Sequence, residues 1–162
     1  MAELDAKTFW RLMGARPVSV PVVAARGPDG PAGLLGLSAT HVAASPPSML
    51  VCVGQSTSAL QTIKSSGAFA ISYLPEGAEE TAEIFGGRRG LSGADRFAEG
   101  EWVTMTTGAP ILANAVLALD CRVSAVFVHE GTELVVGRIE DYATSERTPL
   151  TTLGGRYRGI TP

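Results

Sequence analysis

The sequence contains a pair of long β-prone runs, residues 116–129 and 133–144, separated by a short segment that includes Gly131. Runs of this length with so short a connection predict a β-hairpin. The other runs that predict strands are residues 18–26, 32–43, 48–54, 68–74 and 149–153. Because 19 glycines and 10 prolines favour short elements joined by tight turns, we expect a mainly β barrel with short helices.

Short amphipathic segments between these runs predict helices at residues 5–14, 56–65 and 76–85. Asp5 is a suitable cap for the first helix, and Gly14 is a natural end for it. Pro21 predicts that the strand containing it lies at an edge or carries a bulge. No repeat or linker divides the sequence, so residues 1–162 are expected to form a single domain.

Charge and hydropathy exclude several classes of function. The net charge is -3 and no run of Lys or Arg is present, so no nucleic-acid partner is expected. No apolar run reaches the length of a membrane-spanning helix, and the first residues do not look like a signal peptide. Cys52 and Cys121 lie in separate apolar runs and are expected to be free thiols, which fits a soluble protein of the cytoplasm.

The usual catalytic signatures are missing from the sequence. A nucleophile needs an oriented base, yet the chain has two histidines and no Gly-x-Ser-x-Gly elbow, so no catalytic side chain is predicted. His41 and His129 have no neighbours at metal-ligand spacing, so no metal is expected. Neither a Gly-x-Gly-x-x-Gly motif nor a P-loop is present, and any nucleotide must therefore be bound in another way.

One segment suits a phosphate. Gly54-Gln-Ser-Thr-Ser58 lies between a predicted strand and a predicted helix, where backbone N–H groups, hydroxyls and the helix dipole favour an anion. The alternative is ordinary capping of the helix by the same hydroxyls. The segment alone does not decide between these interpretations.

Several segments in their order along the chain resemble the flavin reductase family, the reductase partners of two-component flavin monooxygenases. In the first half they are Phe9-Trp-Arg-Leu-Met-Gly14, Gly33-Leu-Leu-Gly-Leu-Ser-Ala-Thr40, Ser45-Pro-Pro47 and Val51-Cys-Val-Gly-Gln-Ser-Thr-Ser58. In the second half they are Gly67-Ala-Phe-Ala-Ile-Ser72, Phe85-Gly-Gly87, Asp95-Arg-Phe97, Thr107-Gly-Ala-Pro110, Leu119-Asp-Cys-Arg-Val123 and Gly155-Arg-Tyr157. The resemblance extends from about Phe9 to Arg158.

This resemblance implies an FMN-binding split β-barrel of Greek-key-like topology. It also implies an NAD(P)H-dependent flavin reductase that passes hydride from NADH or NADPH to FMN or FAD and supplies reduced flavin to an oxygenase component. The protein would be a homodimer with each flavin near the interface. Because hydride passes directly between the two rings, no protein nucleophile is needed.

The resemblance also implies which residues bind the flavin. The ring would lie against Leu37, Ser38, Ala39 and Thr40, and the phosphate against Gln55, Ser56, Thr57 and Ser58. The other residues expected at the flavin are Val53, Gly54, Phe85 and Tyr157. Tyr157 could equally anchor the tail by packing and one hydrogen bond.

The chain departs from the family at two places. Leu35 and Leu37 replace the polar residues that usually precede the serine, so side-chain contacts to flavin are reduced. The hairpin reads Glu130-Gly-Thr-Glu133 where many members carry Gly-Asp-His or Gly-Thr-His near the nicotinamide. His129 is expected to take that place, although a strand-end histidine bonded to backbone or water is the alternative.

Two other functions stay open on the sequence. One is a flavin- or haem-binding split-barrel carrier or sensor without turnover. The other is a reductase of a different acceptor, such as a cobalt corrinoid, that acts through bound flavin. The absence of NAD(P)H oxidation despite flavin binding would favour the carrier.

Overall fold

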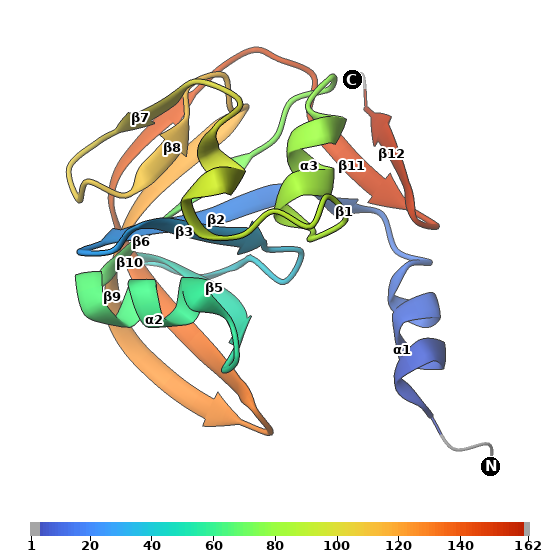
Figure 1. The fold of residues 1–162 in the computed structure, drawn as a ribbon, viewed down its shortest axis with the longest axis horizontal. Helices are drawn as coiled ribbons and strands as arrows, with labels where there is room; N and C mark the ends of the chain where they lie inside the picture. Colours follow the sequence, from blue (N-terminus) through green and yellow to red (C-terminus); the bar gives the residue numbers. More distant parts are fainter. Residues whose placement is uncertain (1–3, 161–162) are drawn as a thin grey trace.

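The computed structural model describes residues 4–160 and contains a seven-stranded antiparallel sheet with two small sheets beside it (Figure 1). The helices are α1 (Ala6–Met13), α2 (Ser58–Ser66), α3 (Glu79–Phe85) and the 3-10 helix Gly93–Phe97. The strands are β1 (Val18–Ser19), β2 (Pro21–Gly27), β3 (Gly30–Leu35), β4 (Thr40–Ala44), β5 (Pro47–Gly54), β6 (Ala68–Tyr73), β7 (Trp102–Thr104), β8 (Pro110–Leu112), β9 (Leu117–His129), β10 (Thr132–Thr144), β11 (Leu150–Leu153) and β12 (Arg156–Gly159). The mainly β fold that the sequence predicts is confirmed.

The main sheet has the strand order β3-β2-β6-β9-β10-β5-β4, in which every neighbouring pair is antiparallel. The predicted hairpin of β9 and β10 forms its centre. Two irregularities in register, at Val136/Gly137 and Ile139/Asp141, interrupt this long pair. Such bulges bend and twist a hairpin, which lets the sheet curl into a split barrel.

The core has two parts, one on each face of β2 and β6. Val22 and Ala70 belong to the part that α3 covers, whereas Val23 and Phe69 belong to the part that α2 covers. Residues 21–25 are therefore all buried, although neighbouring side chains point to opposite faces. A strand with two covered faces has a continuous apolar run in place of an alternating one.

The structure corrects two expectations on this sheet. Pro21 is neither at an edge nor at a bulge, because β2 lies between β3 and β6 and Pro21 is its first residue, a position that tolerates proline. The run 32–43 is two strands. The N–H of Gly36 donates to the Pro21 carbonyl at 2.8 Å and that of Ala39 to the Gly36 carbonyl at 2.9 Å, and these bonds form a turn between them.

One carboxylate is completely buried in this fold. Asp120 on β9 accepts a hydrogen bond from the backbone N–H of Thr107 at 2.7 Å and a second from the hydroxyl of Thr107. These bonds hold the turn between β7 and β8 against the sheet, because a buried carboxylate must be satisfied by donors. Within residues 4–160 no helix is long and apolar enough to span a membrane.

Candidate functional site

A cavity of about 760 Å³ lies between α1, the segment before β4, the end of α3 and the small sheet of β11 and β12. Its size is within the range that small-molecule sites occupy in proteins. The lining residues are Phe9, Trp10, Met13, Gly14, Arg16, Val18, Leu34, Leu35, Leu37, Ser38, Cys52, Phe85, Gly86, Arg88, Thr152, Gly155 and Tyr157. Of the residues predicted to bind flavin, the structure places Leu37, Ser38, Phe85 and Tyr157 in this wall.

The apolar wall of the cavity is supported from behind. Phe85 contacts Phe97 and Trp102 with ring centroids 5.0 Å and 5.4 Å apart. A Cβ at Gly33 would lie 2.9 Å from the Phe85 ring, so β3 can approach the ring this closely only because residue 33 has no side chain. The Arg96 guanidinium donates to the Gly33 carbonyl at 2.9 Å and anchors the loop after α3 to the same strand. The wall is therefore held rigidly before any ligand binds.

The Ser38 hydroxyl binds backbone. Its Oγ accepts from the N–H of Cys52 at 3.1 Å and lies 3.4 Å from the Cys52 carbonyl oxygen. This link ties the turn before β4 to β5 and leaves Leu37 exposed on the cavity side. Ala39 packs against the core beneath the turn, and Thr40 begins β4 opposite Leu50. The segment thus presents an apolar surface, as the replacement of polar residues by leucines indicates.

The turn after β5 shows the helix capping that is one interpretation of its sequence. The Thr57 hydroxyl accepts from the Leu60 N–H at 3.3 Å and donates to the Gly54 carbonyl at 2.9 Å, so Thr57 caps α2. Ser56 and Ser58 are exposed beside the helix start. Capping therefore uses one hydroxyl, while the others and the dipole of α2 are available to an anion.

The register of three strands decides which hairpin residues lie on the same face as Cys52 of the cavity wall. Gly54, Thr132 and His129 are paired across β5, β10 and β9. They share a face with Cys52, because side chains two residues apart on a strand point the same way. The N–H of Gln55 also donates to the Gly131 carbonyl at 3.0 Å. The hairpin turn and the turn after β5 are therefore in contact.

Glu133 faces the opposite side of the same strands. It is paired with Val53, which is fully buried in the core, and its carboxylate contacts the Lys64 ammonium of α2 at 3.0 Å. The side chain of Val53 is closed to any ligand, so only its backbone could contribute to binding. His129, and not Glu133, thus lies on the same face of the strands as Cys52, which lines the cavity.

Tyr157 on β12 lies in the cavity wall opposite Thr152 of β11. Burial raises the pKa of its phenol, and the neighbouring Glu83 carboxylate raises it further. The phenol therefore stays protonated at neutral pH and can donate a hydrogen bond. The residue also packs against the core, so it anchors the tail and at the same time lines the cavity.

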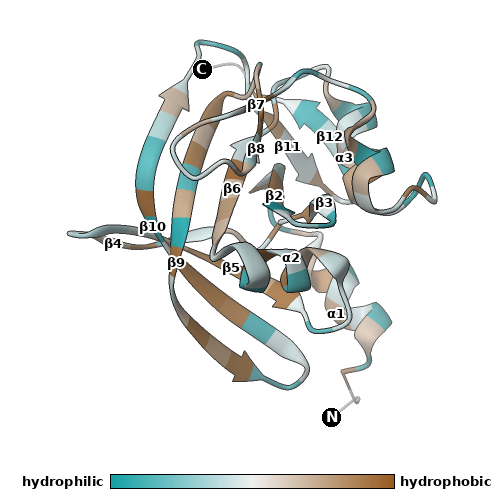
Figure 2. Cartoon of the chain, turned by 60° about the vertical axis from the view of Figure 1, so that its left-hand side comes forward, coloured by the Kyte–Doolittle hydropathy of each residue, from teal (hydrophilic) through white to brown (hydrophobic). Residues whose placement is uncertain are grey.

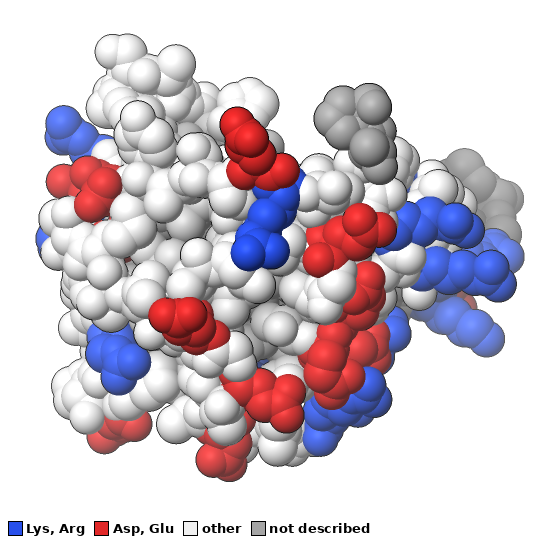
Figure 3. Space-filling model, turned by 90° about the horizontal axis from the view of Figure 1, so that it is seen from above, with Lys and Arg blue, Asp and Glu red and all other residues white. Residues whose placement is uncertain are grey.

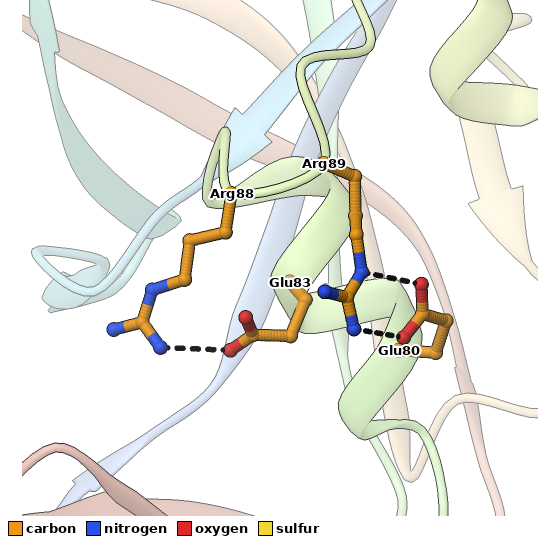
Figure 4. A network of polar contacts seen from close by, with 4 residues as sticks. All are labelled: Glu80, Glu83, Arg88 and Arg89. Carbon is orange, nitrogen blue, oxygen red and sulfur yellow. Dashed lines mark hydrogen bonds and ion pairs between the residues drawn. The ribbon is translucent and has the colours of Figure 1, made fainter.

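The arginines of the loop after α3 differ from each other (Figure 4). Arg89 forms two hydrogen bonds to Glu80, at 2.7 Å and 2.6 Å, and does not line the cavity. Arg88 bonds to Glu83 at 2.9 Å and does line it. Residue spacing alone does not distinguish Arg88 from Arg89, because the difference depends on which glutamate of α3 each one reaches.

The wall formed by α1 was not expected from the sequence. Phe9, Trp10 and Arg16 line the cavity from α1 and the segment after it. The helix is held by its end, where the N–H of Gly154 donates to the Gly14 carbonyl at 2.7 Å. The sequence did contain a signal, because Phe9-Trp-Arg-Leu-Met-Gly14 is one of the segments that resemble the flavin reductase family. In the structure this helix has no buried residue, and Trp10 is 69% exposed. Ala39, Thr40, the segment 53–58 and His129 lie outside the lining residues. No group of three His, Cys, Asp or Glu suited to a metal occurs within residues 4–160.

We predict that the two thiols react at very different rates in the folded protein. Cys52 is partly exposed in the cavity wall, whereas Cys121 is completely buried and its pKa is raised to about 12, chiefly by burial and then by Asp120 and Glu140. Because the thiolate is the nucleophile, iodoacetamide should modify only Cys52 at mildly alkaline pH. Peptide mass spectrometry identifies the labelled site, and both thiols should react in urea. Equal labelling of Cys121 in the folded protein would contradict this arrangement.

Comparison with known proteins identifies one family and several of its named members. Residues 13–161 match the family model described as a flavin reductase like domain. A protein of Ancylobacter novellus named FMN reductase (NADH) RutF is 41% identical over 105 residues, which are 65% of this chain and 57% of that protein. FMN reductase (NADH) RutF 1 of Methylorubrum extorquens is 31% identical over 158 residues, which are 97% of this chain and 77% of that protein. The chain thus spans less than two thirds of the length of the Ancylobacter relative.

A solved structure has the same fold. The NADH:FAD oxidoreductase SgcE6 of Streptomyces globisporus, in complex with NAD and FAD fragments, superposes with a TM-score of 0.89 at 29% identity. The superposition covers 100% of this chain and 97% of that one. The split-barrel architecture expected from the sequence is confirmed.

Proposed function

We propose that this chain, which belongs to the flavin reductase like domain family, is an NAD(P)H-dependent flavin reductase that acts on FMN or FAD. The observation that carries this proposal is the cavity beside Leu37 and Cys52, from which β5 leads directly into the capped turn 54–58. The cavity offers an apolar surface for a ring system, and the turn offers a helix start for its phosphate. The relatives named FMN reductase and NADH:FAD oxidoreductase support the same chemistry.

The residues of this chain would bind and orient two rings. A bound flavin supplies the hydride acceptor, so the protein itself needs no nucleophile. Leu37 and Phe85 provide apolar surface, while the turn at Ser58 fixes the phosphate. His129 is the group we place beside the nicotinamide, because its face of the hairpin continues that of Cys52. Holding the reacting atoms together supplies much of the rate enhancement in such a reaction.

We infer that the flavin is exchanged between turnovers. The Ser38 hydroxyl is engaged with Cys52, and Leu35 and Leu37 cannot form hydrogen bonds through their side chains. Few directed bonds to the ring favour release, which suits delivery of reduced flavin to an oxygenase component in the cytoplasm. Gel filtration of the protein loaded with FMN should separate protein from flavin, and co-elution of a full equivalent would contradict this inference.

We also propose that the protein is a homodimer that forms through the end of the β9–β10 hairpin. Val126, Phe127 and Val128 are consecutive and 39%, 60% and 65% exposed, so both faces of this strand end are open. Figure 2 shows the hydrophobic colour along the projecting part of β9. A second copy would cover this apolar surface, as closed symmetric pairs commonly do.

The homodimer predicts that Phe127→Asp yields a monomer in solution. A charge placed at the centre of an apolar interface is strongly unfavourable, whereas it costs little on a free surface. Light scattering after size exclusion measures the mass, which should fall to one half. Val103→Asp provides a matched control, since Val103 on β7 is 41% exposed but lies away from this hairpin. A wild-type protein that is already monomeric would contradict the proposal.

A further inference from the structure

Two arginines from separate segments of the chain line the cavity. Arg16 lies between α1 and β1, and Arg88 lies in the loop after α3. Neither belongs to the turn 54–58, where we place the flavin phosphate. Both residues are exposed side chains on the same cavity, so they present two positive charges to any ligand within it.

The setting of Arg88 suits an anion. One edge of its guanidinium is bound to Glu83, whose side chain is only 17% exposed, while the Arg88 side chain is 61% exposed. Figure 4 shows Glu83 holding Arg88 on one side, with Arg89 engaged separately by Glu80. A guanidinium has five donors, so a single carboxylate contact orients the group and leaves donors for a phosphate.

The charged residues that line the cavity have one sign, and Glu83 lies behind Arg88. Among residues 4–160 its lining includes Arg16 and Arg88 and no Asp or Glu. Seen from above, basic side chains gather at the side of the molecule where α1 and β12 lie, beyond a band of acidic ones (Figure 3). A concave site lined by one charge sign concentrates ligands of the opposite sign.

We propose that Arg16 and Arg88 form a second anion subsite, which binds the pyrophosphate of a dinucleotide. The inference rests on the proposed function, because it concerns the substrates of the same cavity. FMN has a single phosphate, which the turn 54–58 would bind. FAD adds one further phosphate to that of FMN, which one or both arginines could bind, whereas a nicotinamide dinucleotide carries a separate pyrophosphate whose two phosphates match two guanidinium groups.

The test is equilibrium binding without turnover, with ADP-ribose as the probe. ADP-ribose has the pyrophosphate and lacks both reacting rings, whereas AMP has one phosphate. Titration calorimetry should show that Arg16→Gln and Arg88→Gln each weaken ADP-ribose binding about tenfold, the loss typical of one charge-assisted phosphate contact. Arg88→Lys should lose less, because it keeps the charge beside Glu83. Arg89→Gln is the matched control and should bind as the wild type does.

Further titrations distinguish the source of the pyrophosphate. If the pyrophosphate belongs to FAD, the protein with both Arg16→Gln and Arg88→Gln should bind FAD about as weakly as FMN. Its affinity for FMN should equal that of the wild type. If the pyrophosphate belongs to the hydride donor, NADH binding should fall and FAD binding should stay constant. Unchanged binding of ADP-ribose, FAD and NADH in folded variants would overturn the proposal, as would an equal loss in Arg89→Gln. If the wild type binds ADP-ribose but never oxidises NADH, the proposed reductase function is wrong while the anion subsite still stands.

Discussion

Replacing Ser58 with aspartate is expected to weaken FMN binding about a hundredfold, while riboflavin binding changes by less than about twofold. Ser58 is the first residue of α2 and is exposed beside the cap formed by Thr57. A carboxylate there would repel the flavin phosphate at short range, and riboflavin has no phosphate to repel. Fluorescence quenching of the two flavins measures both affinities on the same protein.

The variant keeps its fold in this test, because an acidic residue in the first turn of a helix interacts favourably with the helix dipole. Ser58→Ala separates repulsion from the loss of the hydroxyl, and we expect a change of only a few-fold in FMN affinity. Equal losses for FMN and riboflavin in Ser58→Asp would show that the phosphate does not lie at this turn. Helix capping would then be sufficient to explain the sequence of residues 54–58.

Truncation of Phe69 to alanine is expected to lower the free energy of unfolding by about 3–5 kcal/mol, a large part of the stability of a small domain. Phe69 is the largest fully buried side chain and belongs to the core part beneath α2. Its removal leaves a cavity where β6, β9 and β10 meet. Urea unfolding followed by circular dichroism measures the loss, and a change below about 1 kcal/mol would contradict the packing described here.

Gly137 provides a second variant for the same contact. A Cβ at Gly137 would lie 2.5 Å from the Phe69 ring and 2.9 Å from the Cβ of Cys121, so Gly137→Ala should cost about 1–3 kcal/mol through overpacking. In the Phe69→Ala background the ring is gone, and the same substitution should cost less. Additive losses in the double variant would mean that the two sites are independent.

The sequence predicts the central elements of this fold because their patterns are local. The β9–β10 hairpin follows from two long β-prone runs around Gly131, and α2 follows from its capping residues and Gly67. β7 and β8 are missed because three-residue strands have no periodicity to detect. The turn at residues 36–39 is missed because its bonds reach back to Pro21, a long-range contact without a local signal.

The candidate site is predicted only in part for the same reason. Leu37, Ser38, Phe85 and Tyr157 come together in the cavity as the family resemblance implies. The Ser38 hydroxyl bonds to Cys52 because β5 lies beside its turn. Arg88 lines the cavity and Arg89 does not, because each is bonded to a different glutamate of α3. Trp10 and Arg16 reach the cavity because the tail at Gly154 holds α1 in place. These are tertiary contacts, and residue spacing alone does not contain them.

Reductase activity of the purified chain tests the central claim most directly. NAD(P)H oxidation is followed at the nicotinamide absorbance while FMN or FAD is varied, with each flavin and each nucleotide tried in turn. A flavin reductase is expected to show oxidation that increases with the concentration of free flavin and saturates, and that needs no added metal. Flavin binding without nucleotide oxidation would contradict this function and would identify the protein as a carrier or sensor.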